Sequence, residues 1–141
     1  MTLSNLIGKS LEQITVDHRV IKRLIVAAER NIADSKVAVV SAENRFDAAY
    51  KAIMQIANAA LQANGYRILT SKPGHHQTMI QLLSKTLEID SHTVILLDAM
   101  RKQRNAADYS GDVVPESTVK DCITQAEKLL QHFKRSQIAT S

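Results

Sequence analysis

Apolar residues recur along most of this chain at the three- and four-residue spacing of a helix face. The pattern predicts helices at about residues 17–33, 41–64, 75–87, 91–109 and 115–133. The second of these has the clearest stripe, formed by Phe46, Ala49, Tyr50, Ile53, Ala57, Ala60 and Leu61. Helices of these lengths with short connections predict an all-α fold, an antiparallel four-helix up-and-down bundle with a short fifth helix.

The residues at the expected helix ends favour the same boundaries. Asp17 and Ser41 are suited to N-cap positions, where a side-chain oxygen accepts a free backbone N–H. The pair Asn64 and Gly65 is typical of a C-terminal stop. The TSKPG segment at 70–74 is the clearest loop of the chain.

A length of 141 residues is suited to one domain with a single core. We expect residues 17–134 to form the bundle and residues 1–16 to form an N-terminal arm or short helix, docked on the body or on a second subunit. The apolar segment 37–40 is interpreted as a connection that plugs one end of the bundle. Residues 135–141 turn polar and are expected to fray.

The composition favours an ordinary globular protein, with 45% hydrophobic and 23% charged residues. We see no signal-peptide pattern and no apolar run of the roughly 18 residues that a membrane span needs, so we expect a cytoplasmic protein without a membrane partner. The single cysteine, Cys122, lies on an apolar stripe and is interpreted as a buried hydrophobe. The net charge of +4 is compatible with a nucleotide or RNA partner.

The fourth predicted helix ends in a polar cluster that a helix does not need in order to stop. Leu97, Met100 and Arg104 step by three and four residues, so Arg104 continues the core stripe. A guanidinium in that position needs a carboxylate, a route to solvent or an anionic ligand. Asp108, one turn further, is spaced to pair with Arg104. Two interpretations stay open: a ligand site, or a structural lock in which Tyr109 packs over the helix end.

The sequence RNAADY, which begins at Arg104, resembles the signature of HEPN domains, the nucleotide-binding helical bundles of higher eukaryotes and prokaryotes. The segment RFDAAYKAIMQIANAALQANGY at 45–66 is similar to that family's Ala-rich helix, with its central Ala-Tyr and terminal Gly. The order of the helices agrees over residues 17–133. The resemblance implies a homodimer, and a protein partner such as a minimal nucleotidyltransferase in a toxin–antitoxin or defence pair.

In ribonucleases of the family the Arg is followed by four to six residues and then by a His, and these enzymes cleave RNA without a metal. This chain has Asp108 and Tyr109 in that region, and a tyrosine with a pKa of about 10 is a poor base at neutral pH. The chain is more similar to the branch of the family whose motif ends in Arg…Ala-Asp-Tyr. The resemblance therefore implies a non-catalytic nucleotide- or RNA-binding module. In it Arg104 would hold a phosphate, Asn105 and Asp108 would orient it or read a base, and Tyr109 would stack or donate a hydrogen bond.

Other residues leave alternatives open. His75 and His76, at the start of the third predicted helix, are exposed helix-start residues, phosphate ligands together with Lys72, or a displaced catalytic histidine of a metal-independent ribonuclease. Arg45 either reaches the polar centre near Arg104 or forms a surface pair. A third alternative is a purely structural protein-interaction bundle. The chain has no Gly-rich phosphate loop and no Glu-x-x-His motif, so we expect no metal and no cofactor.

Overall fold

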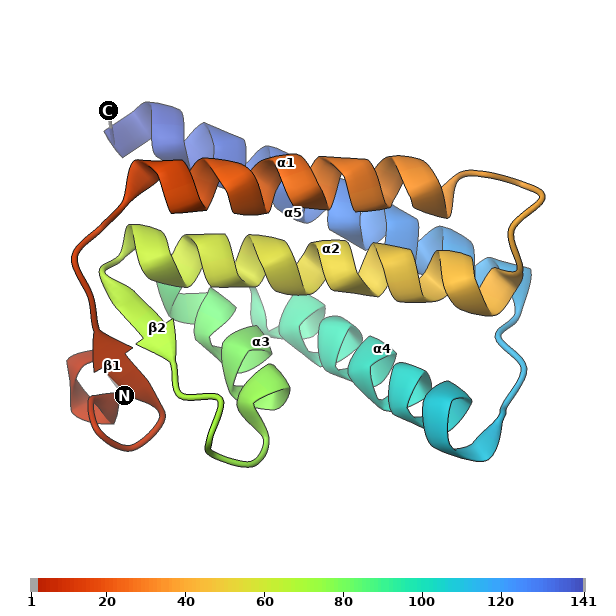
Figure 1. The fold of residues 1–141 in the computed structure, drawn as a ribbon, viewed down its shortest axis with the longest axis horizontal. Coiled ribbons are helices and arrows are strands. Elements are labelled where there is room, and N and C mark those ends of the chain that lie inside the picture. Colours follow the sequence, from red (N-terminus) through yellow and green to blue (C-terminus); the bar gives the residue numbers. More distant parts are fainter. Residues whose placement is uncertain (1–2, 141) are drawn as a thin grey trace.

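The computed structural model describes residues 3–140, with side chains as far as residue 138, and this part of the chain is mostly helical. All five predicted helices are present, with bounds close to those expected (Figure 1). They are α1 (His18–Ser35), α2 (Ala42–Ala63), α3 (His75–Thr86), α4 (Ser91–Ser110) and α5 (Glu116–Thr140). A 3-10 turn, η1 (Leu3–Leu6), and two short strands, β1 (Leu11–Gln13) and β2 (Tyr66–Ile68), complete the fold. Within this range no helix is both long and apolar enough to cross a membrane.

Helix α2 is the centre of the molecule and packs against each of the other four helices and against β2. In Figure 1, α1 lies beside α2 and runs in the opposite direction, α5 lies behind them, and α3 and α4 lie on the other side of α2. The predicted stripe of α2 is buried throughout, and so are residues on its other faces, because neighbours surround it. The additional buried residues are Ala52, Met54, Ile56, Ala59 and Gln62.

The N-caps predicted for the first two helices, and the stop predicted for the second, are confirmed. The side chain of Asp17 accepts a hydrogen bond from the backbone N–H of Arg19, and Ser41 caps α2 by accepting from the N–H of Asn44. Asn64 ends α2, and Gly65 follows with a φ of +86°, a conformation that glycine adopts at little cost.

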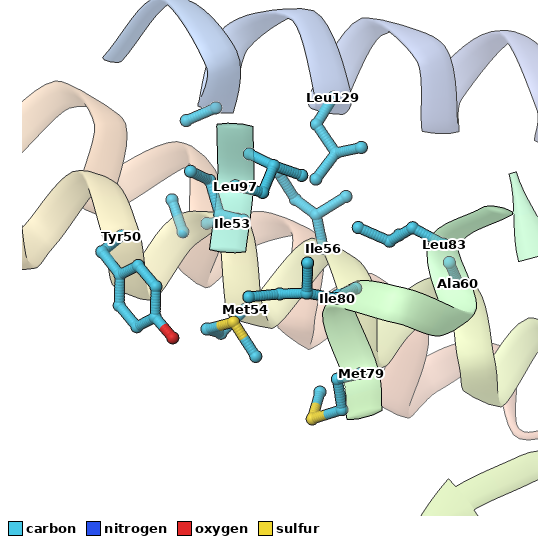
Figure 2. Close-up of a cluster of buried hydrophobic side chains, with 14 of the residues drawn as sticks. Tyr50, Ile53, Met54, Ile56, Ala60, Met79, Ile80, Leu83, Leu97 and Leu129 are labelled. Atoms are coloured by element: carbon cyan, nitrogen blue, oxygen red, sulfur yellow. The ribbon is translucent and has the colours of Figure 1, made fainter. Parts of the chain in front are cut away.

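Helix α4 is the least buried of the helices, and this determines where the site lies. Only Leu97 and Met100 of this helix are buried, because α4 packs mainly on α3 and α2. Figure 2 shows the core that these helices share, where Leu97 meets residues of α2, α3 and α5. The second half of α4 lies at the edge of this core, so Arg104 is only partly buried.

The short sheet was not predicted. β1 pairs with β2 in an antiparallel ladder that places Leu11 opposite Ile68, and both side chains are buried. Each strand has only three residues, which is too short for an alternating pattern to stand out in the sequence. The arm at 1–16 therefore contains a 3-10 turn and a strand, while Met1 and Thr2 lie outside the described residues.

One further expectation is wrong. Val39 is 95% exposed and Val37 is 44% exposed, so the segment 37–40 does not plug the bundle. It stays outside because α1 and α2 pack directly on each other and close the core without it. Beyond Phe133, α5 continues to Thr140, so it includes the described part of the segment 135–141. Lys134 in this extension forms an ion pair of 3.0 Å with Glu29 of α1; Ser141 lies outside the described residues.

Candidate functional site

A pocket of about 360 Å³ opens between α2, β2, α3 and the second half of α4. Six of its lining residues come from α2. Their positions repeat every three to four residues, so they lie on one face of the helix. These are Asp47, Tyr50, Lys51, Met54, Gln55 and Asn58. The rest of the lining comes from β2 and the following loop, from α3 and from α4: Ile68, Thr70, His75, His76, Met79 and Arg104.

Arg104 is held by two carboxylates and a ring. Its Nε lies 3.3 Å from Oδ1 of Asp47 on α2 and 3.2 Å from Oδ2 of Asp108 on its own helix. Its guanidinium carbon lies 5.4 Å from the centre of the Tyr50 ring, within the range of a cation–π contact. The predicted pair with Asp108 is confirmed, and the contact with Asp47 was not foreseen. With 31% of its side chain exposed, Arg104 reaches both the pocket and solvent.

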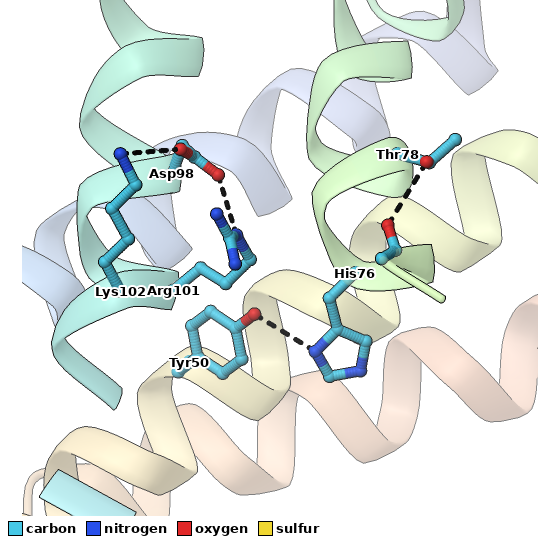
Figure 3. A network of polar contacts seen from close by, with 7 residues as sticks. Tyr50, His76, Thr78, Asp98, Arg101 and Lys102 are labelled. Atoms are coloured by element: carbon cyan, nitrogen blue, oxygen red, sulfur yellow. Dashed lines mark hydrogen bonds and ion pairs between the residues drawn. The ribbon is translucent and has the colours of Figure 1, made fainter. Parts of the chain in front are cut away.

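His76 is joined to Tyr50 through a hydrogen bond of 3.2 Å between its Nδ1 and the tyrosine hydroxyl (Figure 3). Burial raises the pKa of Tyr50 to about 12, so its hydroxyl keeps its proton. Burial lowers the pKa of His76, and the positive charges of Arg104 and Arg101, with His75 beside it, add to this effect. Both groups are uncharged and the phenol is the more acidic of the two, so we assign Tyr50 as the donor to Nδ1, which places the His76 proton on Nε2.

Arg101 lies beside this pair but is engaged elsewhere. Its Nε donates to Asp98 at 2.7 Å, and Lys102 contacts the other oxygen of the same carboxylate at 3.7 Å (Figure 3). The Arg101 guanidinium therefore acts on Tyr50 and His76 only through its charge.

The structure brings together three of the residues singled out in the sequence. Arg104, His75 and His76 line the same pocket although they come from two helices. The rings of His75 and His76 meet edge to face, with centroids 4.8 Å apart. His75 and His76 are therefore not simply exposed helix-start residues, because both are partly buried in the pocket wall.

Other candidates lie elsewhere. Arg45 forms an ion pair with Glu116 and donates to the carbonyl of Val40, so it does not reach Arg104. Tyr109 is 88% exposed, so the alternative interpretation, in which it packs over the end of α4, is wrong. Tyr109 lies in the last turn of α4, just before the C-cap Gly111. Asn105 and Lys72 are not part of the pocket lining.

Sequence reasoning missed most of the α2 wall. Asp47, Lys51, Gln55 and Asn58 follow one another at helical spacing beside the apolar stripe. Such a polar stripe is typical of a solvated face, and only the position of α3 and α4 turns it into a pocket wall. The unusual feature that marks this face is Met54, an apolar residue within the polar stripe.

Within the described residues no three His, Cys, Asp or Glu side chains are grouped so that they could hold a metal ion. In the comparisons with known proteins, no family model matches the chain and no curated protein matches it. The site must therefore be interpreted from its own geometry.

Proposed function

We propose that the protein is a non-catalytic nucleotide- or RNA-binding module of the HEPN type, with the pocket as its ligand site. The observation that carries the proposal is the convergence of Arg104 from α4 with His75 and His76 from α3 on one pocket. Tyr50, Met54 and Met79 supply ring and thioether surfaces to the same pocket. Pockets that combine apolar walls with a few polar groups are typical small-molecule sites.

The family assignment and the detailed architecture belong to the same proposal. The position of Arg104 in the second half of α4, facing a pocket, supports the resemblance carried by the RNAADY sequence. The opposite directions of α1 and α2 support a four-helix up-and-down arrangement. Exposed Ile95, Tyr109 and Val113 on α4 and the loop after it support a homodimer. A nucleotidyltransferase-type partner, as part of a toxin–antitoxin or defence pair, rests on the resemblance alone.

The test is binding of labelled single-stranded RNA and of nucleotides by the wild type, Arg104→Ala and Arg23→Ala. Arg23 is an exposed arginine of α1 and controls for the loss of one positive charge. We expect binding to be lost in Arg104→Ala, which removes the side chain that forms the α4 wall of the pocket, and kept in Arg23→Ala. A wild-type protein that binds neither RNA nor nucleotides would overturn the proposal, and so would binding that does not depend on Arg104.

A second candidate function is metal-independent cleavage of RNA, favoured by the histidines in the Arg104 pocket. His75 is the better base, because Nδ1 of His76 accepts from Tyr50 and its Nε2 carries the proton. Incubation with RNA in the presence of a chelator distinguishes the two functions. Cleavage that disappears in both Arg104→Ala and His75→Ala would establish the ribonuclease, and uncleaved RNA that still binds would establish the binding module.

A further inference from the structure

The charges in the pocket are already balanced within the protein, which bears on the kind of ligand it takes. Arg104 is paired with both Asp47 and Asp108, and its guanidinium lies over the Tyr50 ring. Lys51 is the other cation of the lining; it is exposed and forms no ion pair within the described part of the chain. A phosphate placed inside would lose its water and meet Asp47 beside the only inner cation, which is unfavourable.

The histidine in the wall does not restore a positive charge. His76 is neutral near pH 7, since its buried site and the charges of Arg104 and Arg101 both disfavour protonation. Its Nε2 proton makes it a neutral donor. A neutral donor can bind carbonyl oxygens and ring nitrogens, which are acceptors that need no positive charge opposite them.

Two side-chain amides on α2 supply further neutral donors to the pocket, in addition to Nε2 of His76. The Oε1 of Gln55 accepts from Nδ2 of Asn31 at 2.8 Å, and Oδ1 of Asn58 accepts from Nε2 of Gln62 at 3.2 Å. Each amide oxygen therefore already accepts one hydrogen bond from the protein. The NH2 groups of Gln55 and Asn58 have no protein acceptor among the described residues, so they are available to a ligand.

The remaining walls are apolar and suited to a flat ring. Met54, Ile68 and Met79 are each less than a tenth exposed and line the same pocket. Figure 2 shows Met54 and Met79 on the same side of the core as the Tyr50 hydroxyl. Thioether groups pack well against aromatic rings, and a cavity of about 360 Å³ is large enough for a heterocyclic base.

We propose that this pocket takes an uncharged, acceptor-rich heteroaromatic ring, a nucleobase, and that any phosphate attached to it stays outside, near Lys51. This inference rests on the proposed function and specifies which part of the nucleotide the pocket recognises. Gln55, Asn58 and His76 read the acceptor edge of the base, and the methionines cover its faces.

The experiment is calorimetric titration with adenosine, guanosine, cytidine and uridine, with their 5′-monophosphates and with inorganic phosphate, at low and high salt. We expect the dissociation constant of the preferred nucleoside to lie within about threefold of that of its monophosphate and to change little with salt. Inorganic phosphate should not compete with the nucleoside. If monophosphates bind and free nucleosides do not, the inference is wrong while the proposed function stands. If neither nucleotides nor RNA bind, both are wrong.

A matched pair of variants tests whether the side-chain amide of Gln55 donates to the base. Gln55→Glu replaces the NH2 donor by a carboxylate of the same shape, and Gln81→Glu makes the same change on the exposed face of α3 outside the pocket. We expect nucleoside affinity to fall about tenfold or more in Gln55→Glu and to stay unchanged in Gln81→Glu. Equal affinities in the two variants, both folded by circular dichroism, would overturn the role of Gln55 and with it the proposed orientation of the base.

Discussion

Asp47 and Arg104 lie 57 positions apart in the chain, yet Oδ1 of Asp47 is 3.3 Å from Nε of Arg104. The contact joins the first turns of α2 to the second half of α4, where no apolar side chain beyond Met100 is buried. Arg104 therefore both lines the pocket and holds α4 against α2.

The structural role of Arg104 can be measured separately from binding. We expect Arg104→Ala to lower the free energy of unfolding by about 0.5–1 kcal/mol, because the partly exposed pair is screened by water. A double-mutant cycle with Asp47→Ala should give a coupling of the same order. Urea denaturation measures both, with Arg23→Ala as the neutral control. A loss of several kcal/mol would instead identify Arg104 as a buried lock of the bundle.

The His76 site predicts a pH dependence of stability. The folded pKa of His76 is lowered from its ordinary value of 6.5, so the unfolded chain binds a proton more readily just below that pH. Stability therefore falls as the pH drops through 6.5 toward the folded pKa. Denaturation at a series of pH values should show this fall in the wild type and a smaller one in His76→Gln. His18→Gln, at an exposed position of α1, should keep the wild-type profile.

The helices could be predicted from the sequence because their signals are local. Asp17 and Ser41 cap the helices they precede, and the stripe from Phe46 to Leu61 is buried as expected. Val37–Val40 misled the prediction because hydrophobicity alone does not say which apolar segment the core has room for. The strands escaped prediction since their pairing joins Leu11 to Ile68, and nothing local encodes that contact.

Substitution of two valines, one buried and one exposed, tests whether burial decides how much an apolar residue stabilises the fold. Val119 of α5 is fully buried and Val39 is 95% exposed. We expect Val119→Ala to cost about 2 kcal/mol of unfolding free energy, whereas Val39→Ala should have an effect within about 0.5 kcal/mol of zero. Thermal and urea denaturation check both values. Similar effects for the two variants would contradict the burial assigned to either position.

The thiol of Cys122 should be unreactive toward thiol reagents in the native protein. It is fully buried, and burial raises the pKa of its thiol to about 12, so both access and thiolate are lacking. We expect a thiol reagent to modify the protein in urea and not in buffer at neutral pH. Cys122→Ser should cost about 1–3 kcal/mol because it buries a hydroxyl in an apolar environment. Rapid labelling of the native protein would contradict this assignment.

The site was only half visible in the sequence. Arg104 drew attention because a charge continued an apolar stripe, and His75 and His76 because they follow a loop. These three residues line one pocket only because of the way the chain passes from α3 into α4, and residue spacing does not predict that path. Asp47 and Gln55 were hidden because a polar helix face is ordinary until another helix approaches it.

The pairing of β1 with β2 makes the pocket depend on strand register. Side chains alternate between the two faces of a strand, so a slip by one residue exchanges inside and outside. In the observed register Ile68 faces inward opposite Leu11, while Arg67 is exposed and pairs with Glu12. A one-residue slip would turn Ile68 to solvent and bring the charge of Arg67 into an apolar wall. The three residues of β1, more than fifty positions upstream, thus fix which side chain of β2 lines the pocket.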